Sequence, residues 1–205
     1  MSISFCGYKH LSPDSIYLIS LENKKLDDFF FEICKHTFPE AQIKIHSIKV
    51  PTKGSVCSTY LLSDMIDPKS KMLVTALDQV FDIPLDLSTF SKSSFVCPII
   101  SQHKNNSYSY LIRDDEGNPI QVYEDQCISE EALAGIYYFK NADIFYEYFE
   151  KLMLKFKGFR GRNFYMSDLI NELILDKNDL FFPDISEKKL EKFKDLQKIY
   201  EKNRS

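Results

Sequence analysis

The feature that most constrains the fold is an alternation of strand-like and helix-like segments in the first 76 residues. Ser15–Ser20 is a β-branched and aromatic run after a Pro13-Asp14 turn signal, and residues 24–37 carry apolar side chains at helical spacing. The pattern predicts strands over residues 15–20, 42–50 and 71–76, with helices over residues 24–37 and 55–66 between them. This order indicates an α/β fold whose parallel sheet is covered by helices.

The rhythm changes in the second half of the chain. A strand over residues 95–102 precedes a hairpin whose turn is Asp114-Asp115-Glu116-Gly117-Asn118. Further elements are predicted as a strand over residues 135–139, a helix over 141–156, a short helix over 166–174 with Ser167 as its cap, and an amphipathic C-terminal helix over 186–202. With no linker, residues 1–205 are predicted to form a single domain.

Composition excludes several classes of partner. The 205 residues contain 26 Lys+Arg and 30 Asp+Glu, so the net charge of -4 gives no broad attraction for polyanions, although it leaves room for a local basic site, and no nucleic-acid partner is expected. No apolar run is long enough to span a membrane and no secretory signal is visible, so we expect no membrane partner and a cytoplasmic location. The five cysteines lack C-x-x-C spacing and the four histidines lack ligand spacing, so any metal would be held by carboxylates.

Open parallel sheets bind ligands at the carboxyl ends of their strands, which singles out two places. At Gly54 and Ser55 the backbone can approach a ligand closely and a helix begins, although an ordinary turn and cap explains the same residues. Asp78 follows the apolar strand over residues 72–76 and is suited to Mg²⁺, although aspartate also terminates many strands.

Five segments, in order, resemble those of bacterial sugar-phosphate nucleotidyltransferases, especially the capsule and lipopolysaccharide type. Residues 51–62 (PTKGSVCSTYLL) are similar to the family's T-x-G-x-x-x-T-x-L-L segment, and residues 72–79 (MLVTALDQ) to its L-L-I-x-N-S-D-Q strand. The hairpin over residues 109–124, the strand GIYYF over 135–139 and the segment FYMSDLIN over 164–171 also resemble family motifs.

The resemblance implies a Rossmann-like nucleotide-diphospho-sugar transferase fold, a GT-A-like mixed sheet with helices on both faces. It implies Mg²⁺ bound by Asp78 and Asp184. It implies nucleotide binding by Gly54, Ser55 and Thr59. It implies acceptor binding by Tyr110, Glu124, Gly135 and Asp168. For Tyr110 and Tyr137, a role as core aromatic residues is the alternative.

The chain departs from the family pattern in two respects. Residues 1–12 contain no G-x-G-x-R loop, which in the family holds the triphosphate, so we expect an N-terminally truncated member that is inactive on its own. Asp125 stands where the family has a lysine that contacts the sugar phosphate. Loss of the family's first strand would leave strands 15–20 and 72–76 with unpaired backbone groups unless residues 1–7 or another chain filled the gap, or the sheet closed up.

The resemblance therefore implies transfer of a nucleotidyl group from a nucleoside triphosphate to a phosphorylated sugar-like acceptor, with Mg²⁺, in surface-polysaccharide biosynthesis. A catalytically silent truncated homologue, or one half of a split enzyme acting as a binding or structural protein, is the alternative, and either a partner chain or a homo-oligomer would complete it. A glycosyltransferase is a third reading, which the single carboxylate of Leu77-Asp78-Gln79 disfavours because those enzymes carry a D-x-D pair.

Overall fold

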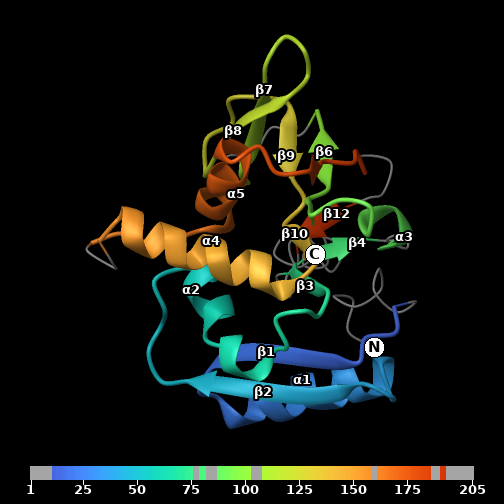
Figure 1. Ribbon diagram of the computed structural model, residues 1–205. Coiled ribbons are helices and arrows are strands. Elements are labelled where there is room, and N and C mark those ends of the chain that lie inside the picture. The colour runs from blue at the N-terminus through green and yellow to red at the C-terminus, as the bar shows by residue number, and fades with distance from the viewer. Residues whose placement is uncertain are drawn as a thin grey trace, which may run out of the picture. The chain divides into compact units, whose positions relative to one another are not determined.

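The computed structural model describes residues 11–75, 79–81, 87–102, 108–157, 161–185 and 190–192 (Figure 1). The chain divides into two compact units. The first unit contains β1, α1, β2, β4 and β12, and the second contains the other elements. The assignment of residues 1–205 to a single domain stays a prediction.

The first unit is built on one β–α–β motif. β1 (Ser15–Leu21) and β2 (Gln42–Ile48) pair in parallel, and α1 (Lys24–Thr37) connects them and lies along one face of the pair (Figure 1). These three elements confirm the prediction. The apolar stripe of α1 is only partly covered, since Cys34 is fully buried while Phe29 is 57% exposed.

The first unit also contains β4 (Gln79–Phe81), which pairs antiparallel with β12 (Leu190–Lys192). The prediction of a helix is therefore wrong at residues 190–192, where pairing with β4 satisfies the backbone in place of helical hydrogen bonds. The rest of the predicted helix over residues 186–202 lies outside the described residues.

The second unit contains two four-stranded sheets, the first in the order β11-β5-β10-β3. Its strands are β11 (Leu180–Phe181), β5 (Phe95–Val96), β10 (Ile136–Phe139) and β3 (Met72–Thr75). β3 is antiparallel to β10 and, among the described strands, pairs with β10 alone. The expectation that β3 extends a parallel sheet with β1 and β2 is thus not met in the described strands, because β10 supplies an antiparallel partner along all of β3.

The second sheet has the order β6-β9-β7-β8. Its strands are β6 (Ile99–Ser101), β9 (Glu131–Leu133), β7 (Tyr110–Arg113) and β8 (Pro119–Tyr123), the last two forming the predicted hairpin. The predicted strand over residues 95–102 is broken into β5 and β6 at Pro98, which has no N–H to donate. On the neighbouring segment Ala134 N donates to the Pro98 carbonyl at 2.8 Å, and Gly135, with φ 71°, leads the chain from β9 into β10.

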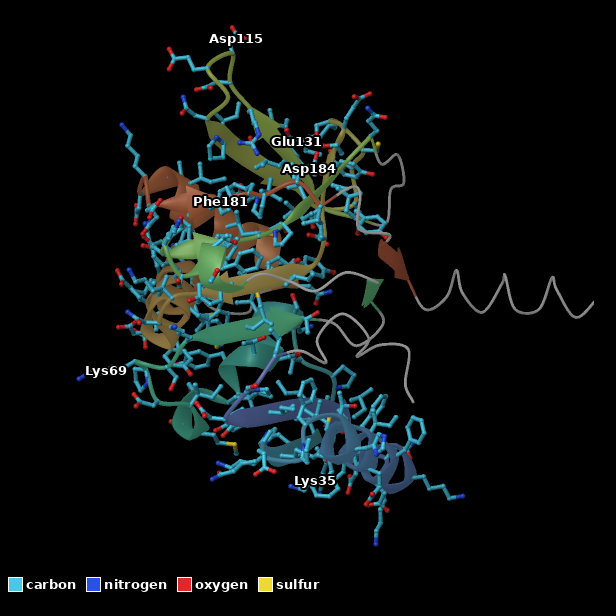
Figure 2. All side chains as sticks on the ribbon, turned by 90° about the vertical axis from the view of Figure 1, so that its right-hand side faces the viewer. Lys35, Lys69, Asp115, Glu131, Phe181 and Asp184 are labelled. Carbon is cyan, nitrogen blue, oxygen red and sulfur yellow. The ribbon has the colours of Figure 1, made fainter. Side chains whose placement is uncertain are left out.

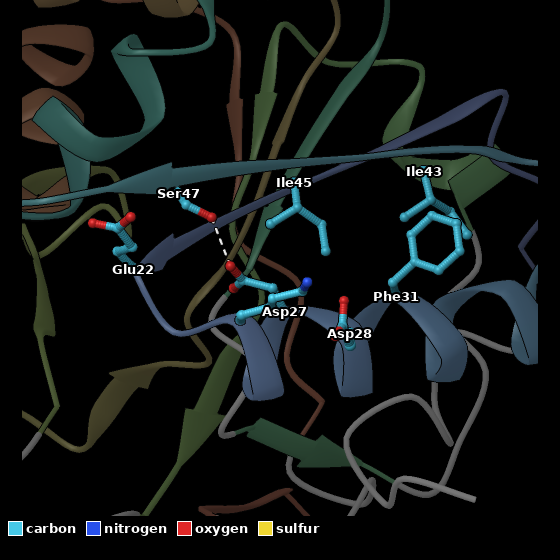
Figure 3. Close-up of a pocket in the computed structure, with 8 residues that line it drawn as sticks. Glu22, Asp27, Asp28, Phe31, Ile43, Ile45 and Ser47 are labelled. Carbon is cyan, nitrogen blue, oxygen red and sulfur yellow. Dashed lines mark hydrogen bonds between the residues drawn. The ribbon is translucent and has the colours of Figure 1, made fainter.

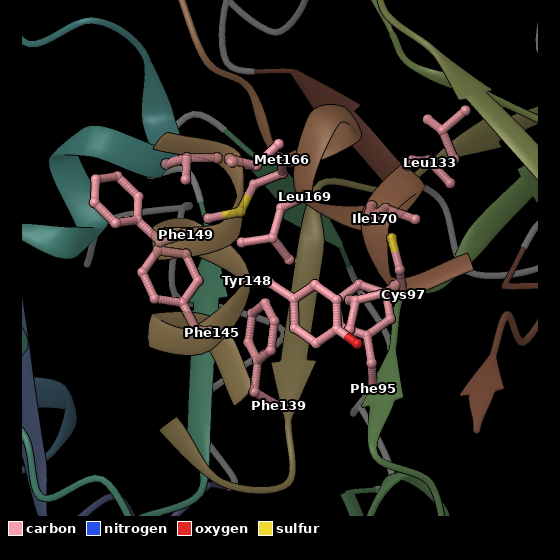
Figure 4. Packing of buried hydrophobic residues seen from close by; sticks show 14 of the residues in the cluster. Phe95, Cys97, Leu133, Phe139, Phe145, Tyr148, Phe149, Met166, Leu169 and Ile170 are labelled. Carbon is pink, nitrogen blue, oxygen red and sulfur yellow. The ribbon is translucent and has the colours of Figure 1, made fainter. Parts of the chain in front are cut away.

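The helices of the second unit enclose an aromatic core. They are α2 (Ser55–Tyr60), the 3-10 turn η2 (Ser63–Met65), the short α3 (Leu87–Phe90), α4 (Ala142–Lys155) and α5 (Met166–Leu175). Figure 4 shows Phe139 of β10 beside Phe145 of α4, and Phe149 of α4 and Leu169 of α5 belong to the same cluster, all 5% exposed or less. In the described part of the chain no helix combines the length and apolarity needed to cross a membrane.

Candidate functional site

The best-defined polar cluster of the second unit is centred on Glu124, which directly follows β8. Its Oε2 atom accepts hydrogen bonds from Ser109 Oγ at 2.7 Å and from Ser167 Oγ at 2.6 Å. Ser109 precedes β7 and Ser167 lies in the first turn of α5, and they are 8% and 4% exposed. Three segments of the chain therefore converge on one partly buried carboxylate.

Tyr137 of β10 interacts electrostatically with the Glu124 carboxylate. Burial of the phenol, with smaller contributions from Cys97 and Glu124, raises the pKa of Tyr137 well above its usual value of 10.0. The hydroxyl therefore stays protonated at neutral pH. Gly135, two residues earlier, follows Leu133 and Ala134, and Leu133 N donates to the Ser109 carbonyl at 2.8 Å. The predicted acceptor residues Glu124 and Gly135 thus share this region.

The loop that carries Gly54 is fixed to the segment that precedes α5. Phe164 N donates to the Lys53 carbonyl at 2.7 Å, and Val56 N donates to the Phe164 carbonyl at 3.4 Å. Gly54 has φ 103°, and a Cβ atom built on it would lie 2.2 Å from the Phe164 carbonyl oxygen. Only glycine fits here, because the backbone is in the left-handed region and no space is left for a side chain. Phe164 is three residues from Ser167, so the loop is tied to the same segment as the Glu124 cluster.

The other predicted nucleotide-binding residues differ in accessibility. Ser55 is exposed at the start of α2, whereas Thr59 is buried and its hydroxyl donates to the Ser55 carbonyl at 3.0 Å. The N–H of Val56, expected to be available to a ligand at the start of the helix, is instead directed at Phe164. These contacts favour a structural role for Thr59 and leave Gly54 and Ser55 as the accessible part of the loop.

Asp168 takes part in helix capping. Its Oδ2 accepts a hydrogen bond from Tyr165 N at 3.0 Å, and its Oδ1 pairs with the Arg162 guanidinium. Arg162 also lies over the Phe156 and Phe164 rings, with its Cζ 4.4 Å and 5.0 Å from their centroids. Asp168 thus fixes the start of α5 and the neighbouring loop, and the helix begins at Met166 without Ser167 as its cap. The predicted contact of Asp168 with an acceptor stays a prediction.

Tyr110 is fully buried in β7, in register with Tyr123 of β8 and Ala132 of β9. This position favours the core-aromatic alternative for Tyr110. Its backbone neighbour Ser109 supplies the polar contact to Glu124 instead.

The proposed metal ligands are placed only in part. Asp184 follows the Phe182-Pro183 segment, bridges to Ile99 of β6, and accepts a hydrogen bond from Ser101 Oγ at 2.6 Å. Figure 2 shows Asp184 near Glu131 of β9, and Glu131 pairs in register with Ser101 of β6. Asp78 lies outside the described residues. Within the described ranges, no three His, Cys, Asp or Glu side chains lie together in an arrangement that could hold a metal ion.

Two surface hollows are lined by residues outside the Glu124 cluster. In the first unit a hollow of about 410 Å³ lies between α1 and β2, where Ser47 Oγ donates to Asp27 Oδ2 at 2.6 Å (Figure 3). Its lining combines carboxylates with Phe31, Ile43 and Ile45. In the second unit a hollow of about 310 Å³ lies along α4, α5 and β8, and Asp168 is the one predicted site residue that lines it. Neither lining includes Glu124 or Gly54, so the hydrogen-bonded cluster around Glu124 is separate from both hollows.

Sequence reasoning missed Ser109 and Ser167 as site residues. Both serines lie within the quoted motifs. The predicted site residues were instead their neighbours Tyr110, which is larger, and Asp168, which is charged. The available signal was their chemistry, because a small hydroxyl beside apolar residues at the start of an element requires a buried partner.

The comparisons with known proteins agree with this architecture. No model of a known protein family matches the chain, and no curated protein matches it. A nucleoside-diphosphate-sugar pyrophosphorylase from Vibrio cholerae RC9 is similar in structure, with a TM-score of 0.72 and 19% identity over 89% of this chain and 76% of the other. An inositol-1-phosphate CTP transferase from T. maritima is similar with a TM-score of 0.64 and 8% identity, over 87% of this chain and 69% of the other.

At these identities the likeness establishes the fold. The structural match covers 89% of this chain in the first comparison and 87% in the second. The chain therefore has the mixed α/β fold of nucleotide-sugar pyrophosphorylases and related nucleotidyltransferases, as its motifs predicted.

Proposed function

We propose that this chain acts in nucleotidyl transfer, binding a nucleoside triphosphate and a phosphorylated sugar-like acceptor, or the nucleotide-sugar that they form. The observation that carries the proposal is the convergence on Glu124 of Ser109 and Ser167, with the Gly54 loop anchored through Phe164 to the same segment. The structural likeness to a nucleoside-diphosphate-sugar pyrophosphorylase supports it.

Glu124 is suited to the acceptor side of such a site. A carboxylate oxygen accepts hydrogen bonds from sugar hydroxyl groups, and charge-assisted bonds of this kind are stronger than neutral ones. We propose that the base is bound at the main chain of Gly54 and Ser55, of which Ser55 is exposed and Gly54 is partly so.

In the proposed reaction a phosphate oxygen of the acceptor attacks the α-phosphorus of the triphosphate. The new P–O bond forms as the bond to the β-phosphate oxygen breaks, and pyrophosphate leaves. The protein performs no covalent step, so its residues act by positioning the two substrates and by stabilising charge. Glu124 and Gly135 would position the acceptor, and the Gly54 loop would position the base.

Mg²⁺ is proposed as the cofactor, and Asp184 is its proposed ligand within the described residues. Oxygen ligands are those that Mg²⁺ prefers, and the ion would neutralise phosphate charge. Among the described residues, Asp184 accepts a hydrogen bond from Ser101 Oγ at 2.6 Å. We also propose a role in building surface polysaccharide, because the motifs resemble those of the capsule type.

The proposal is tested by thermal-shift measurements with CTP, UTP, GTP and dTTP, and with the four corresponding nucleoside diphosphate glucoses, with and without Mg²⁺. A ligand at about 100 times its Kd stabilises the folded chain by about 2.7 kcal/mol. We expect at least one nucleotide-sugar to raise Tm, and Glu124→Gln to reduce that rise without removing it. A wild-type chain that responds to nucleotide-sugars but forms no product from a triphosphate and a sugar 1-phosphate would be the silent binding homologue. A chain that responds to none of the ligands would refute the proposal.

A further inference from the structure

The two serines that contact Glu124 use the same carboxylate oxygen. Ser109 and Ser167 both donate to Oε2, at 2.7 Å and 2.6 Å. The two donors come from separate elements, 15 and 43 residues away from Glu124 in the sequence. Two donors on one oxygen hold that oxygen in place, and because donors prefer the plane of the carboxylate, they restrict its rotation more than one donor would.

The second oxygen of the carboxylate, Oε1, is left available by this arrangement. Within the described part of the chain, Oε1 accepts no hydrogen bond and no lysine or arginine pairs with Glu124. The serines are nearly fully buried, whereas Glu124 is only partly so. The carboxylate is therefore held from its buried side, and the opposite oxygen can accept a hydrogen bond from a ligand.

We propose that Ser109 and Ser167 are positioning residues, which orient Glu124 so that Oε1 receives a hydroxyl group of the acceptor. The proposal rests on the proposed function, since it assigns the acceptor side of that site. The serines act through Glu124 and do not themselves touch the ligand. The competing explanation is that they merely satisfy a partly buried carboxylate and have no influence on binding.

Substitution of either serine separates these explanations. Ser109→Ala and Ser167→Ala are each expected to weaken nucleotide-sugar binding about tenfold, because the carboxylate gains freedom that binding must then remove. Ser109→Thr keeps the hydroxyl and is expected to bind within about twofold of the wild type. Ser91→Ala is the control, since the Ser91 hydroxyl donates only to the Ser88 carbonyl on the same unit.

The decisive measurement is a double-mutant cycle by isothermal titration calorimetry. The probe is whichever of CDP-, UDP-, GDP- or dTDP-glucose stabilises the wild-type chain most, and circular dichroism confirms that each variant is folded. If the serines act through Glu124, either serine substitution in a Glu124→Ala background leaves Kd unchanged.

The outcomes distinguish this inference from the function on which it rests. If both alanine variants bind the probe with the wild-type Kd, the positioning role is overturned, while the proposed function is not. Serine effects that are equally large in the Glu124→Ala background also overturn it, because the serines would then act independently of the carboxylate. A wild-type chain that binds none of the four probes overturns the proposed function, and this inference with it.

Discussion

At the scale of single residues, Gly54 is the position whose identity is most tightly constrained. Its φ of 103° disfavours any residue with a side chain, and an added Cβ atom would also lie 2.2 Å from the Phe164 carbonyl oxygen. Gly54→Ala is therefore expected to lower the free energy of unfolding by about 2–5 kcal/mol, from backbone strain and from displacement of packed atoms. Urea denaturation measures this loss.

A matched control isolates the close contact at Gly54. Gly117 also has a positive φ, of 85°, but no atom lies within 4 Å of its added Cβ. Gly117→Ala should therefore cost only the backbone term, about 1–2 kcal/mol. Equal losses for the two variants would show that Phe164 does not constrain Gly54.

In the first unit, Asp27 provides a residue-scale test of electrostatics. Hydrogen bonds from Ser20 Oγ and Ser47 Oγ, at 2.5 Å and 2.6 Å, hold the pKa of Asp27 below its usual value of 3.8. Because the folded-state pKa is lowered, these bonds stabilise the protein above the unfolded-state pKa, and the stabilisation is lost as pH falls through the folded-state pKa.

Ser47→Ala is accordingly expected to raise the pKa of Asp27 and to reduce stability at pH 7, with the difference from wild type disappearing in acid. Carboxyl carbon NMR titration gives the pKa, and urea denaturation at several pH values gives the stability. Ser91→Ala is the control, since its hydroxyl donates to a backbone carbonyl. An unchanged titration of Asp27 in Ser47→Ala would contradict this explanation.

How far single residues could be predicted depended on whether their role is local. Gly54 was singled out from the sequence because a glycine between a strand and a helix is visible as such. Its partner Phe164 was not, because the two residues are 110 positions apart and their contact depends on tertiary packing. Thr59 and Tyr110 were chosen by motif, and the structure places both in buried positions.

At the scale of elements, Asn171 of α5 connects its helix to the edge of the second sheet. Its Oδ1 accepts from Val122 N at 2.7 Å, and its Nδ2 donates to the Val122 carbonyl at 2.9 Å. The side chain thus replaces a neighbouring strand for β8, which is otherwise the last strand in the sheet.

Asn171→Ala should cost about 2–4 kcal/mol of unfolding free energy, because it leaves a buried N–H and a buried carbonyl without partners. Urea denaturation measures the loss. Asn118→Ala, at the exposed hairpin turn, is the control and should change stability far less. A loss below about 0.5 kcal/mol for Asn171→Ala would mean that water satisfies both groups equally well.

β3 offers a second test at the element scale. In the described part of the sheet it pairs with β10 alone. Alternate amides of β3 are therefore expected to resist hydrogen exchange, while the intervening amides exchange faster. Uniform protection along Met72–Thr75, measured by NMR on the isolated chain, would mean that another strand occupies the second edge.

The element predictions succeeded where local pattern determined the structure. Strand β1 was predicted from its β-branched and aromatic residues, helix α1 from the helical spacing of its apolar residues, and the hairpin from its turn residues. The interruption at Pro98 could have been read from the sequence, since proline cannot donate to a ladder. The pairing of β12 with β4 could not, because the amphipathic pattern around residues 190–192 equally suits a helix.

At the scale of the whole molecule, the order of five motifs predicted the fold class, and structural similarity to nucleotidyltransferases confirms it. The pattern could not provide the sheet assignment of β3, which depends on pairing with β10, 61 or more positions later in the sequence. Nor could it identify the serines around Glu124, since their convergence is a property of the folded second unit.

The central claim is that a nucleotide-sugar binds at Glu124 and the Gly54 loop, and mapping of the ligand-induced NMR shifts tests it most directly. Titration of the isotope-labelled chain with the nucleoside diphosphate glucose that raises Tm most should move the backbone amides of Gly54, Ser55, Glu124, Gly135 and Ser167. Shifts confined to the hollow between α1 and β2, or to the one along α4 and α5, would contradict binding at Glu124 and the Gly54 loop.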